Sequence, residues 1–174
     1  MKPKKKRGGY TLIETLIVIA IMAILASMLL AYNNSSTNNV ALYADQATIA
    51  GVLGRAKSLA LEKWNGNGSG GAACAFGVHF TASGSYFVYE DVPTGTPPNC
   101  DGAHNHAYTG GDIVIQNLAL SGGIGFVSAA QDVWFVPPYL TSVNALITIQ
   151  TKGSAYGVGT SSVQVTSGGA VTSL

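Results

Sequence analysis

The 174 residues include 47% apolar and only 10% charged side chains, and the formal net charge is +1. This apolar content excludes a disordered chain, and the length fits one domain with its own core in addition to an anchor. Five of the nine basic residues lie in the first seven positions, which leaves four basic against eight acidic residues elsewhere. The acidic remainder disfavours general electrostatic binding of nucleic acid.

The amino-terminal segment joins a basic leader to an apolar run that contains one charge. The leader precedes Gly9, and Glu14 is the charged residue inside the run. No charge lies in the 18 residues from Thr15 to Tyr32, a stretch long enough to cross a bilayer. Because the basic residues come first, we expect the amino terminus in the cytoplasm and the carboxyl-terminal domain outside the cytoplasmic membrane.

Glu14 requires an explanation because an ionised carboxylate is costly inside an apolar membrane helix. Cleavage between Gly9 and Tyr10 would create an α-amino group four residues before this carboxylate. The ammonium of one subunit is then a suitable partner for Glu14 of a neighbour. The segment is therefore predicted to serve assembly as well as anchoring.

A basic leader, Gly9, the aromatic Tyr10, Thr-Leu-Ile-Glu and a long apolar tail resemble the class III signal of type IV pilins and type II secretion pseudopilins. The resemblance implies that a membrane aspartyl peptidase removes residues 1–9 and that the new amino terminus, Tyr10, is methylated. It implies that residues 10–32 form the transmembrane and assembly helix, with Glu14 as the assembly carboxylate. One departure is Ala31, near which the family commonly has a proline.

Other kinds of membrane segment remain open. An ordinary secretory signal with a cleavage site near Ala23 to Ser27 would leave Glu14 unexplained in its apolar region. A lipoprotein signal is disfavoured because no cysteine lies near the leader. A plain signal-anchored envelope domain with a binding role remains the main alternative, and it would retain residues 1–9.

Two helical parts are expected before a sheet domain. Residues 33–39 are polar and either break the helix or cap its continuation. Apolar residues then recur at intervals of three and four, which predicts an amphipathic helix over residues 40–64 with one face on a sheet. We expect a spine of two parts, residues 11–32 and 40–64, and a segment of amphipathic helix and linker over residues 33–72.

From residue 73 onward the pattern changes to short strands between glycine-rich turns, which predicts a β-rich globular domain over residues 73–174. Hairpin turns are expected at residues 82–84 and 167–169, and a long loop at residues 91–111. The fold class is thus α+β, with a long amino-terminal helical spine packed on an antiparallel sheet domain. The expected strands are Ala73–Phe80, Ser85–Val92, Asp112–Leu118, Ile124–Ser128, Asp132–Phe135, Leu146–Thr151, Ser161–Thr166 and Ala170–Ser173.

Three weaker features are similar to the H-type minor pseudopilin and its type IV pilus counterpart. They are the helical segment Leu53–Ala60, the strand end Trp134–Pro137 and the closing hairpin Val163–Val171. The resemblance implies a minor subunit of a type IV pilus or a type II secretion pseudopilus, with a major subunit as the alternative. Its implied partners are other pilin or pseudopilin subunits, prepilin peptidase and an assembly platform protein in the cytoplasmic membrane.

Cys74 and Cys100 are the only cysteines, and an oxidising compartment outside the membrane favours a disulfide between them. Two unpaired thiols are the alternative. Asp101, His104 and His106 suggest a metal site, but zinc needs three or four fixed ligands and this stretch supplies no fourth by spacing; His79 lies on a strand of unknown position. We therefore expect solvated histidines and no metal. Calcium would need clustered carboxylates, and only Asp91, Asp101 and Asp112 lie in this stretch.

No catalytic function is expected, because the sequence contains no nucleophile elbow, phosphate loop or HExxH helix. Glu90 and Asp91 are neighbours on a strand and point to opposite faces, so we interpret them as solubilising residues. No cofactor is expected. Some pilins of this kind bind DNA through basic residues near the carboxyl terminus, but the last hundred residues hold a single basic residue, Lys152. No nucleic acid is expected as a partner.

Overall fold

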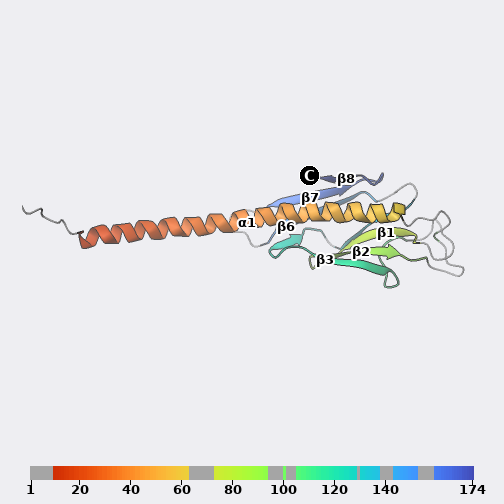
Figure 1. The fold of residues 1–174 in the computed structure, drawn as a ribbon, viewed down its shortest axis with the longest axis horizontal. Coiled ribbons are helices and arrows are strands. Elements are labelled where there is room, and N and C mark those ends of the chain that lie inside the picture. Colours follow the sequence, from red (N-terminus) through yellow and green to blue (C-terminus); the bar gives the residue numbers. More distant parts are fainter. Residues whose placement is uncertain are drawn as a thin grey trace, which may run out of the picture. The chain divides into compact units, whose positions relative to one another are not determined.

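The computed structural model of the chain describes residues 10–62, 73–93, 100, 105–128, 130–137, 143–152 and 159–174, and only the backbone of residues 31–36. The chain divides into two compact units, Met1–Thr37 and Asn38–Leu174, and we consider each by itself. The described residues form one long helix followed by eight strands (Figure 1). This arrangement confirms the predicted α+β class.

The helix α1 extends from Leu12 to Glu62 as a single element. Of the two possibilities for residues 33–39, the structure has the continued helix rather than a break, because these seven residues are helical. Serine, threonine and asparagine each cost only about 0.5–0.7 kcal/mol relative to alanine inside a helix. Once a helix is nucleated on both sides, adding a residue is much easier than starting a new helix, so a short polar stretch does not end it.

The strands form two antiparallel sheets of four. The first sheet has the order β3-β2-β1-β5 and the second has the order β4-β6-β7-β8. Each strand begins and ends within two residues of its predicted limits, because alternating side chains and glycine-rich turns mark these limits in the sequence. The strands are β1 Ala75–Phe80, β2 Ser85–Asp91, β3 Ile113–Ala119, β4 Ile124–Phe126, β5 Gln131–Phe135, β6 Ala145–Thr151, β7 Thr160–Val165 and β8 Val171–Ser173.

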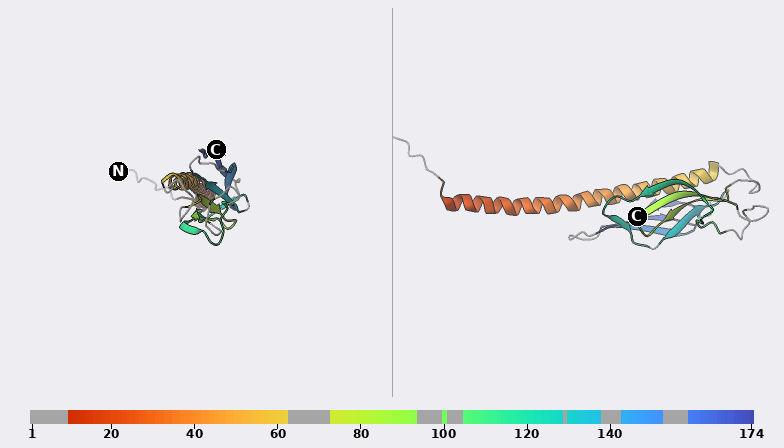
Figure 2. Two further views of the ribbon diagram at one scale, coloured as in Figure 1. Left: turned by 90° about the vertical axis from the view of Figure 1, so that its right-hand side faces the viewer. Right: turned by 90° about the horizontal axis from the view of Figure 1, so that it is seen from below.

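The core of the second unit lies between the carboxyl part of α1 and the two sheets. Figure 1 shows β7 and β8 on one side of this part of the helix and β1 to β3 on the other, and Figure 2 shows the same region from two further sides. The apolar face predicted for the helix over residues 40–64 is confirmed for its described residues, which end at Glu62, since its side chains join those of both sheets in one cluster. Its buried members on α1 are Leu42, Ile49, Val52, Leu53, Ala56 and Ala60.

Two buried polar side chains on α1 tie the helix to the β3–β4 connection, to β7 and to the last residue of the chain. The Asp45 carboxylate accepts hydrogen bonds from the Ser121 backbone N–H at 2.8 Å and from its hydroxyl at 2.9 Å. The Gln46 amide donates to the carbonyl oxygens of Ser162 at 2.8 Å and Leu174 at 3.0 Å. A buried polar group is stable only when it is hydrogen-bonded, so these contacts fix the helix against both sheets.

The two predicted hairpin turns are confirmed. Gly84 ends the turn between β1 and β2 with φ of 95°, and Gly169 lies in the turn between β7 and β8 with φ of 72°. The Gly169 N–H donates to the Thr166 carbonyl at 2.8 Å, which closes this turn. Both positions require the left-handed conformation, which glycine adopts without a steric cost.

Two buried tyrosines set an upper pH limit for the fold. Burial raises the pKa of Tyr86 from 10.0 to about 12, with a contribution from the Asp45 carboxylate. Burial also raises the pKa of Tyr89, as do the charges of nearby aspartates. Both phenols ionise more readily in the unfolded chain than in the folded one. The free energy of unfolding is therefore constant with respect to these groups below a pH of about 10 and falls as the pH rises toward 12.

Circular dichroism and phenolate absorbance, recorded together during an alkaline titration, test this limit. We expect the tyrosines that ionise last to gain phenolate absorbance only as the circular dichroism signal of the sheets is lost, above a pH of about 10. If every tyrosine ionised near that pH while the sheet signal stayed constant, the burial of these two phenols would be contradicted.

Candidate assembly site at the amino end of the helix

Glu14 and Thr11 close the amino end of α1 with reciprocal hydrogen bonds. The Glu14 Oε2 atom accepts from the Thr11 backbone N–H at 2.9 Å and from the Thr11 hydroxyl at 2.8 Å. In return, the Glu14 backbone N–H donates to Thr11 Oγ1 at 3.4 Å. This pattern is a capping box, in which the first residue before the helix and the third residue within it satisfy each other's backbone donors.

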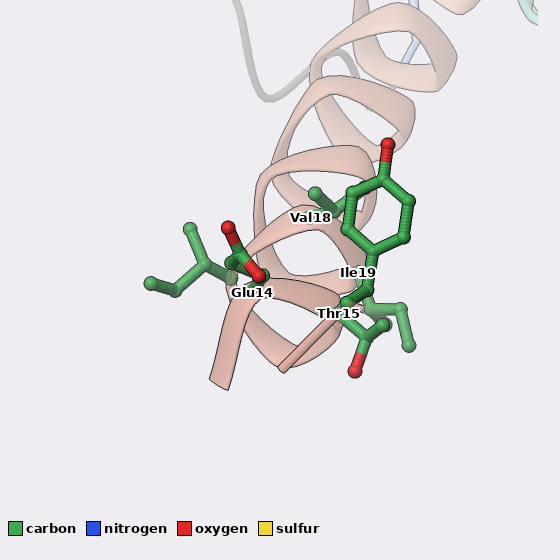
Figure 3. Close-up of a pocket in the computed structure, with 6 residues that line it drawn as sticks. Glu14, Thr15, Val18 and Ile19 are labelled. Atoms are coloured by element: carbon green, nitrogen blue, oxygen red, sulfur yellow. The ribbon is translucent and has the colours of Figure 1, made fainter. Parts of the chain in front are cut away.

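The capping box engages one carboxylate oxygen and leaves the other available. Both Thr11 donors contact Oε2, and no donor among the described residues contacts Oε1. Figure 3 shows the groove beside this carboxylate, with Glu14 on one side of the helix and Thr15 and Ile19 on another. Tyr10, Ile17 and Val18 complete the lining of the groove. Glu14 therefore lines an apolar groove with a carboxylate of which one oxygen is engaged by Thr11, and a cation from another molecule can reach this exposed side chain.

Residues Leu12–Leu30 form a helical segment long and apolar enough to span a membrane, with a mean hydropathy of 2.6 and no buried part within the structure. Its internal hydroxyls bond to their own helix. Thr15 donates to the Leu12 carbonyl at 2.8 Å and Ser27 to the Ile24 carbonyl at 2.7 Å. Such bonds satisfy polar groups that would otherwise be costly in a hydrocarbon environment.

Sequence reasoning identified Tyr10 and Glu14 and missed Thr11. Tyr10 precedes the first helical residue and is 88% exposed, whereas Gly9 lies outside the described residues. The signal for Thr11 was present, because threonine followed three residues later by glutamate is the sequence form of a capping box. Two residues, Tyr10 and Thr11, lie between the predicted cleavage bond and the first helical residue, Leu12.

Replacing Thr11 by valine should loosen the start of the helix without changing its apolar character. The variant keeps the side-chain shape but loses the hydroxyl, and the loss of such a cap exposes the first backbone N–H groups. In detergent micelles, we expect the Glu14 backbone amide to exchange its hydrogen about fivefold faster in Thr11→Val. Thr11→Ser should exchange at the original rate. Equal rates in both variants would contradict the capping role.

The prokaryotic N-terminal methylation motif matches residues 4–30. The chain carries a pilin-type signal. Neither a curated protein nor a solved structure matches the chain. The motif indicates a type IV pilin-like or pseudopilin-like protein, and it implies processing by a prepilin peptidase and assembly with other pilin-type subunits. The motif belongs to structural pilin-type proteins rather than to an enzyme family. Together with the apolar helix, it is consistent with anchoring of the chain in a membrane.

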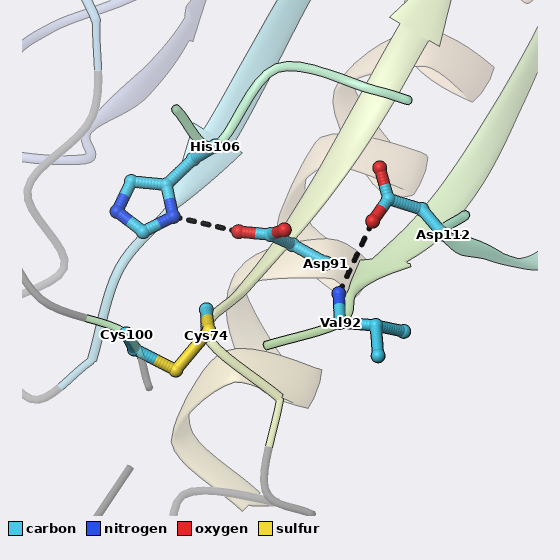
Figure 4. The surroundings of a disulfide bond; sticks show 6 residues. All are labelled: Cys74, Asp91, Val92, Cys100, His106 and Asp112. Atoms are coloured by element: carbon cyan, nitrogen blue, oxygen red, sulfur yellow. Dashed lines mark hydrogen bonds and ion pairs between the residues drawn. A yellow bond between two sulfur atoms is a disulfide. The ribbon is translucent and has the colours of Figure 1, made fainter. Parts of the chain in front are cut away.

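Beyond the methylation motif, the structure joins Cys74 and Cys100 in a disulfide with a sequence separation of 26. The bond ties the segment after β2 to the residue that precedes β1 (Figure 4). It belongs to the sheet domain and lies in a different unit from the pilin-type signal. The disulfide therefore cross-links two segments within the sheet domain.

Two residues near the disulfide differ from their predicted environments. His106 was expected to be solvated, but its Nδ1 atom lies 2.6 Å from Asp91 Oδ2, and its side chain is 16% exposed. Asp91 was interpreted as a solubilising residue, and it is buried with an exposed fraction of 1%. Figure 4 shows this pair beside the disulfide. Both expectations were wrong because a chain segment 15 residues away covers this face of the sheet, a contact that spacing does not reveal.

The same face of the first sheet carries a second histidine–aspartate pair. His79 Nδ1 lies 2.7 Å from Asp132 Oδ1, across the β1–β5 ladder. The His79 ring also stacks on Phe87, at 4.9 Å between centroids, and contacts Tyr108 at 5.3 Å. His79 is thus held by a carboxylate and by aromatic rings.

The structure does not assemble a metal site from these residues. Within the part of the chain that the structure describes, no group of three or more histidine, cysteine, aspartate or glutamate side chains is placed to hold a metal ion. The Asp112 carboxylate accepts from the Val92 N–H at 3.1 Å and from the Thr109 N–H at 2.6 Å. Asp101 and His104 lie outside the described residues.

Proposed function

We propose that this chain is a minor pilin or pseudopilin, a structural subunit that leaves the cytoplasmic membrane to join a type IV pilus or a type II secretion pseudopilus. The observation that carries the proposal is the arrangement at Glu14. Its Oε2 atom caps its own helix, no described donor contacts its Oε1 atom, and the side chain lines an apolar groove. An acceptor that is half engaged in this way suits a cation supplied by a second subunit.

The cation is the α-amino group that cleavage between Gly9 and Tyr10 creates. A methylated amine remains a positively charged donor, so methylation does not remove the attraction. The Thr11 bonds to Oε2 reduce the cost of holding the carboxylate in the membrane before assembly. The Tyr10 ammonium of an adjoining subunit then approaches Oε1, and attraction between the two charges is strong because the surroundings are apolar.

The apolar residues of α1 supply the rest of the contact between subunits. None of the apolar segment from Leu12 to Leu30 is buried within the described chain, so its side chains are available to lipid or to neighbouring helices. Small residues allow helices to approach closely, and this packing offsets the loss of lipid contact when a subunit leaves the membrane. On this segment the small residues are Ala20, Ala23, Ala26 and Ser27.

The sheet domain then lies on the outer side of the cytoplasmic membrane and at the surface of the filament. An assembly platform protein in the membrane and an assembly ATPase drive insertion of subunits at the filament base. The H-type subfamily is the proposed relationship within the pilin-like proteins. It is supported by the positions of Trp134–Pro137 at the end of β5 and of Val163–Val171 in the β7–β8 hairpin.

Intact mass of the protein from its native membrane tests the proposal. We expect a chain that begins at Tyr10 and carries one methyl group, recovered both from the membrane and from sheared filaments. A chain that retains residues 1–9 would overturn the proposal in favour of a signal-anchored envelope domain. The stoichiometry of sheared filaments separates a minor subunit from a major one.

A further inference from the structure

The strand β3 has one edge that no other described strand covers. It is an outer strand of the first sheet and pairs with β2 through residues Ser85 to Glu90. Figure 1 shows β3 at the margin of this sheet. Among the described residues, no backbone hydrogen bond joins Ile113–Ala119 to any strand other than β2. Its outward N–H and C=O groups therefore form a row that another strand can extend.

The other outer strands of the two sheets are protected and β3 is not. Soluble proteins protect outer strands by making them short or by placing charges or prolines on them. The strands β4 and β8 have three residues each, and β5 carries Asp132. The strand β3 has seven residues, Ile-Val-Ile-Gln-Asn-Leu-Ala, with no charge and no proline.

Apolar side chains are exposed beside this edge. Ile113 is 55% and Val114 is 37% exposed, and as neighbours on a strand they point to opposite faces of the sheet. The β2–β3 ladder is irregular between Val88 and Tyr89. This irregularity separates Ile113 and Val114 from the regular part of β3. Gln116–Ala119 remain in regular register with Ser85–Val88, so this part has the geometry that strand addition requires.

We propose that the outer edge of β3 adds an extended, uncharged strand from a neighbouring subunit of the filament. The added strand pairs with Gln116–Ala119 and continues past the irregularity, where its alternating side chains lie beside Ile113 on one face of the sheet and beside Val114 on the other. This inference rests on the proposed function, because it needs a subunit that is packed against others.

The chemistry of the edge identifies its partner as a polypeptide. Alternating main-chain donors and acceptors are matched by another extended main chain at a separation of about 4.8 Å, and strand addition is a common mode of peptide recognition. Lipid headgroups and nucleic acid are recognised through cations, and β3 has none. The nearby Arg55 side chain is already hydrogen-bonded to Gln116.

Photocross-linking in filament-producing cells tests the proposal directly. The photoreactive p-benzoylphenylalanine is placed at position 117, on the outer strand, and in a matched strain at position 164, on β7. Asn117 and Gln164 are both exposed amide side chains on strands, but β7 is covered by a strand on each side. We expect position 117 to form adducts with a polypeptide segment of a filament subunit, and position 164 to form few.

Mass spectrometry of the adducts decides the outcome. An adduct from position 117 to a short extended segment of this chain or of another filament subunit supports the proposal. No adduct, equal adducts from both positions, or adducts to lipid or glycan would overturn it. Intact mass from the same cells keeps the two proposals apart, since a mature chain found in filaments without a position-117 adduct overturns strand addition alone.

A charge on the edge supplies a second measurement. In Asn117→Lys, the lysine opposes strand addition, and we expect the amount of the subunit in sheared filaments to fall about tenfold. Gln164→Lys adds the same charge away from the edge and should leave that amount unchanged. Both variants should retain the original thermal midpoint, which excludes misfolding as the cause. Equal incorporation of the two folded variants would contradict the proposal.

Discussion

Glu14→Gln should be inserted in the membrane and cut like the original chain, yet its amount in filaments should fall about tenfold or more. A glutamine keeps an oxygen that accepts the two Thr11 hydrogen bonds, so the capping box survives. It removes the negative charge, and with it the attraction for the ammonium of an adjoining subunit. Membrane fractions and sheared filaments, compared by quantitative mass spectrometry, give both amounts.

Two further variants separate the charge from the cap. Thr11→Val removes the hydroxyl bond and keeps the charge, so its incorporation should fall far less than that of Glu14→Gln. Glu14→Val removes both and should assemble no better than Glu14→Gln. If Glu14→Gln assembled as well as the original chain, the carboxylate would act only as a helix cap and its pairing role would be wrong.

Loss of the Cys74–Cys100 disulfide should lower the free energy of unfolding of the sheet domain by about 2–4 kcal/mol, because the bond closes a loop in the unfolded chain. We expect the double variant Cys74→Ser/Cys100→Ser to unfold at a lower urea concentration than the original protein. The measurement is equilibrium unfolding of the full chain in detergent, followed by tryptophan fluorescence.

Reduction of the original protein provides the control for this variant. The reduced protein and the double variant should unfold at the same urea concentration, whereas the double variant should not respond to a reducing agent. Coincident unfolding curves for the oxidised and reduced original protein would show that the disulfide does not stabilise the fold.

Much of the fold could be predicted from the sequence because its signals are local. Side chains that point alternately to the two faces along Tyr86 to Asp91 predict β2. Glycines predict the hairpin turns, and Gly84 and Gly169 have the positive φ that such turns need. The buried face of α1 follows from apolar residues at intervals of three and four. The unbroken helix could not be predicted from the polar residues 33–39, because helix propagation outweighs small differences in propensity.

Contacts between distant segments limited what could be predicted. The burial of Asp91 depends on His106, which a loop brings to the same face of the sheet. The order of the strands was also hidden, since β5 pairs with β1 and β4 pairs with β6 rather than with sequence neighbours. The exposed edge of β3 follows from this order, so no reading of Ile113–Ala119 alone identifies it.

At the assembly site, the residues that carry charge were predictable and their geometry was not. Glu14 stands out as the one charge in an apolar run, and Tyr10 follows the predicted cleavage bond. Only the structure shows that both Thr11 donors contact the same Glu14 oxygen and leave the other available. This division of the carboxylate is what makes a role in capping compatible with a role in assembly.

Zero-length cross-linking of purified filaments tests the pairing of subunits most directly. A carbodiimide joins a carboxylate to an amine only when the two are in contact, so a filament treated with it should yield two chains linked between Glu14 and the Tyr10 amine of an adjoining subunit. A linked pair of chains on a denaturing gel, with this bond identified by peptide mass, is the expected result. Mature filaments in which the Tyr10 amine links to other carboxylates, or to none, would contradict the account.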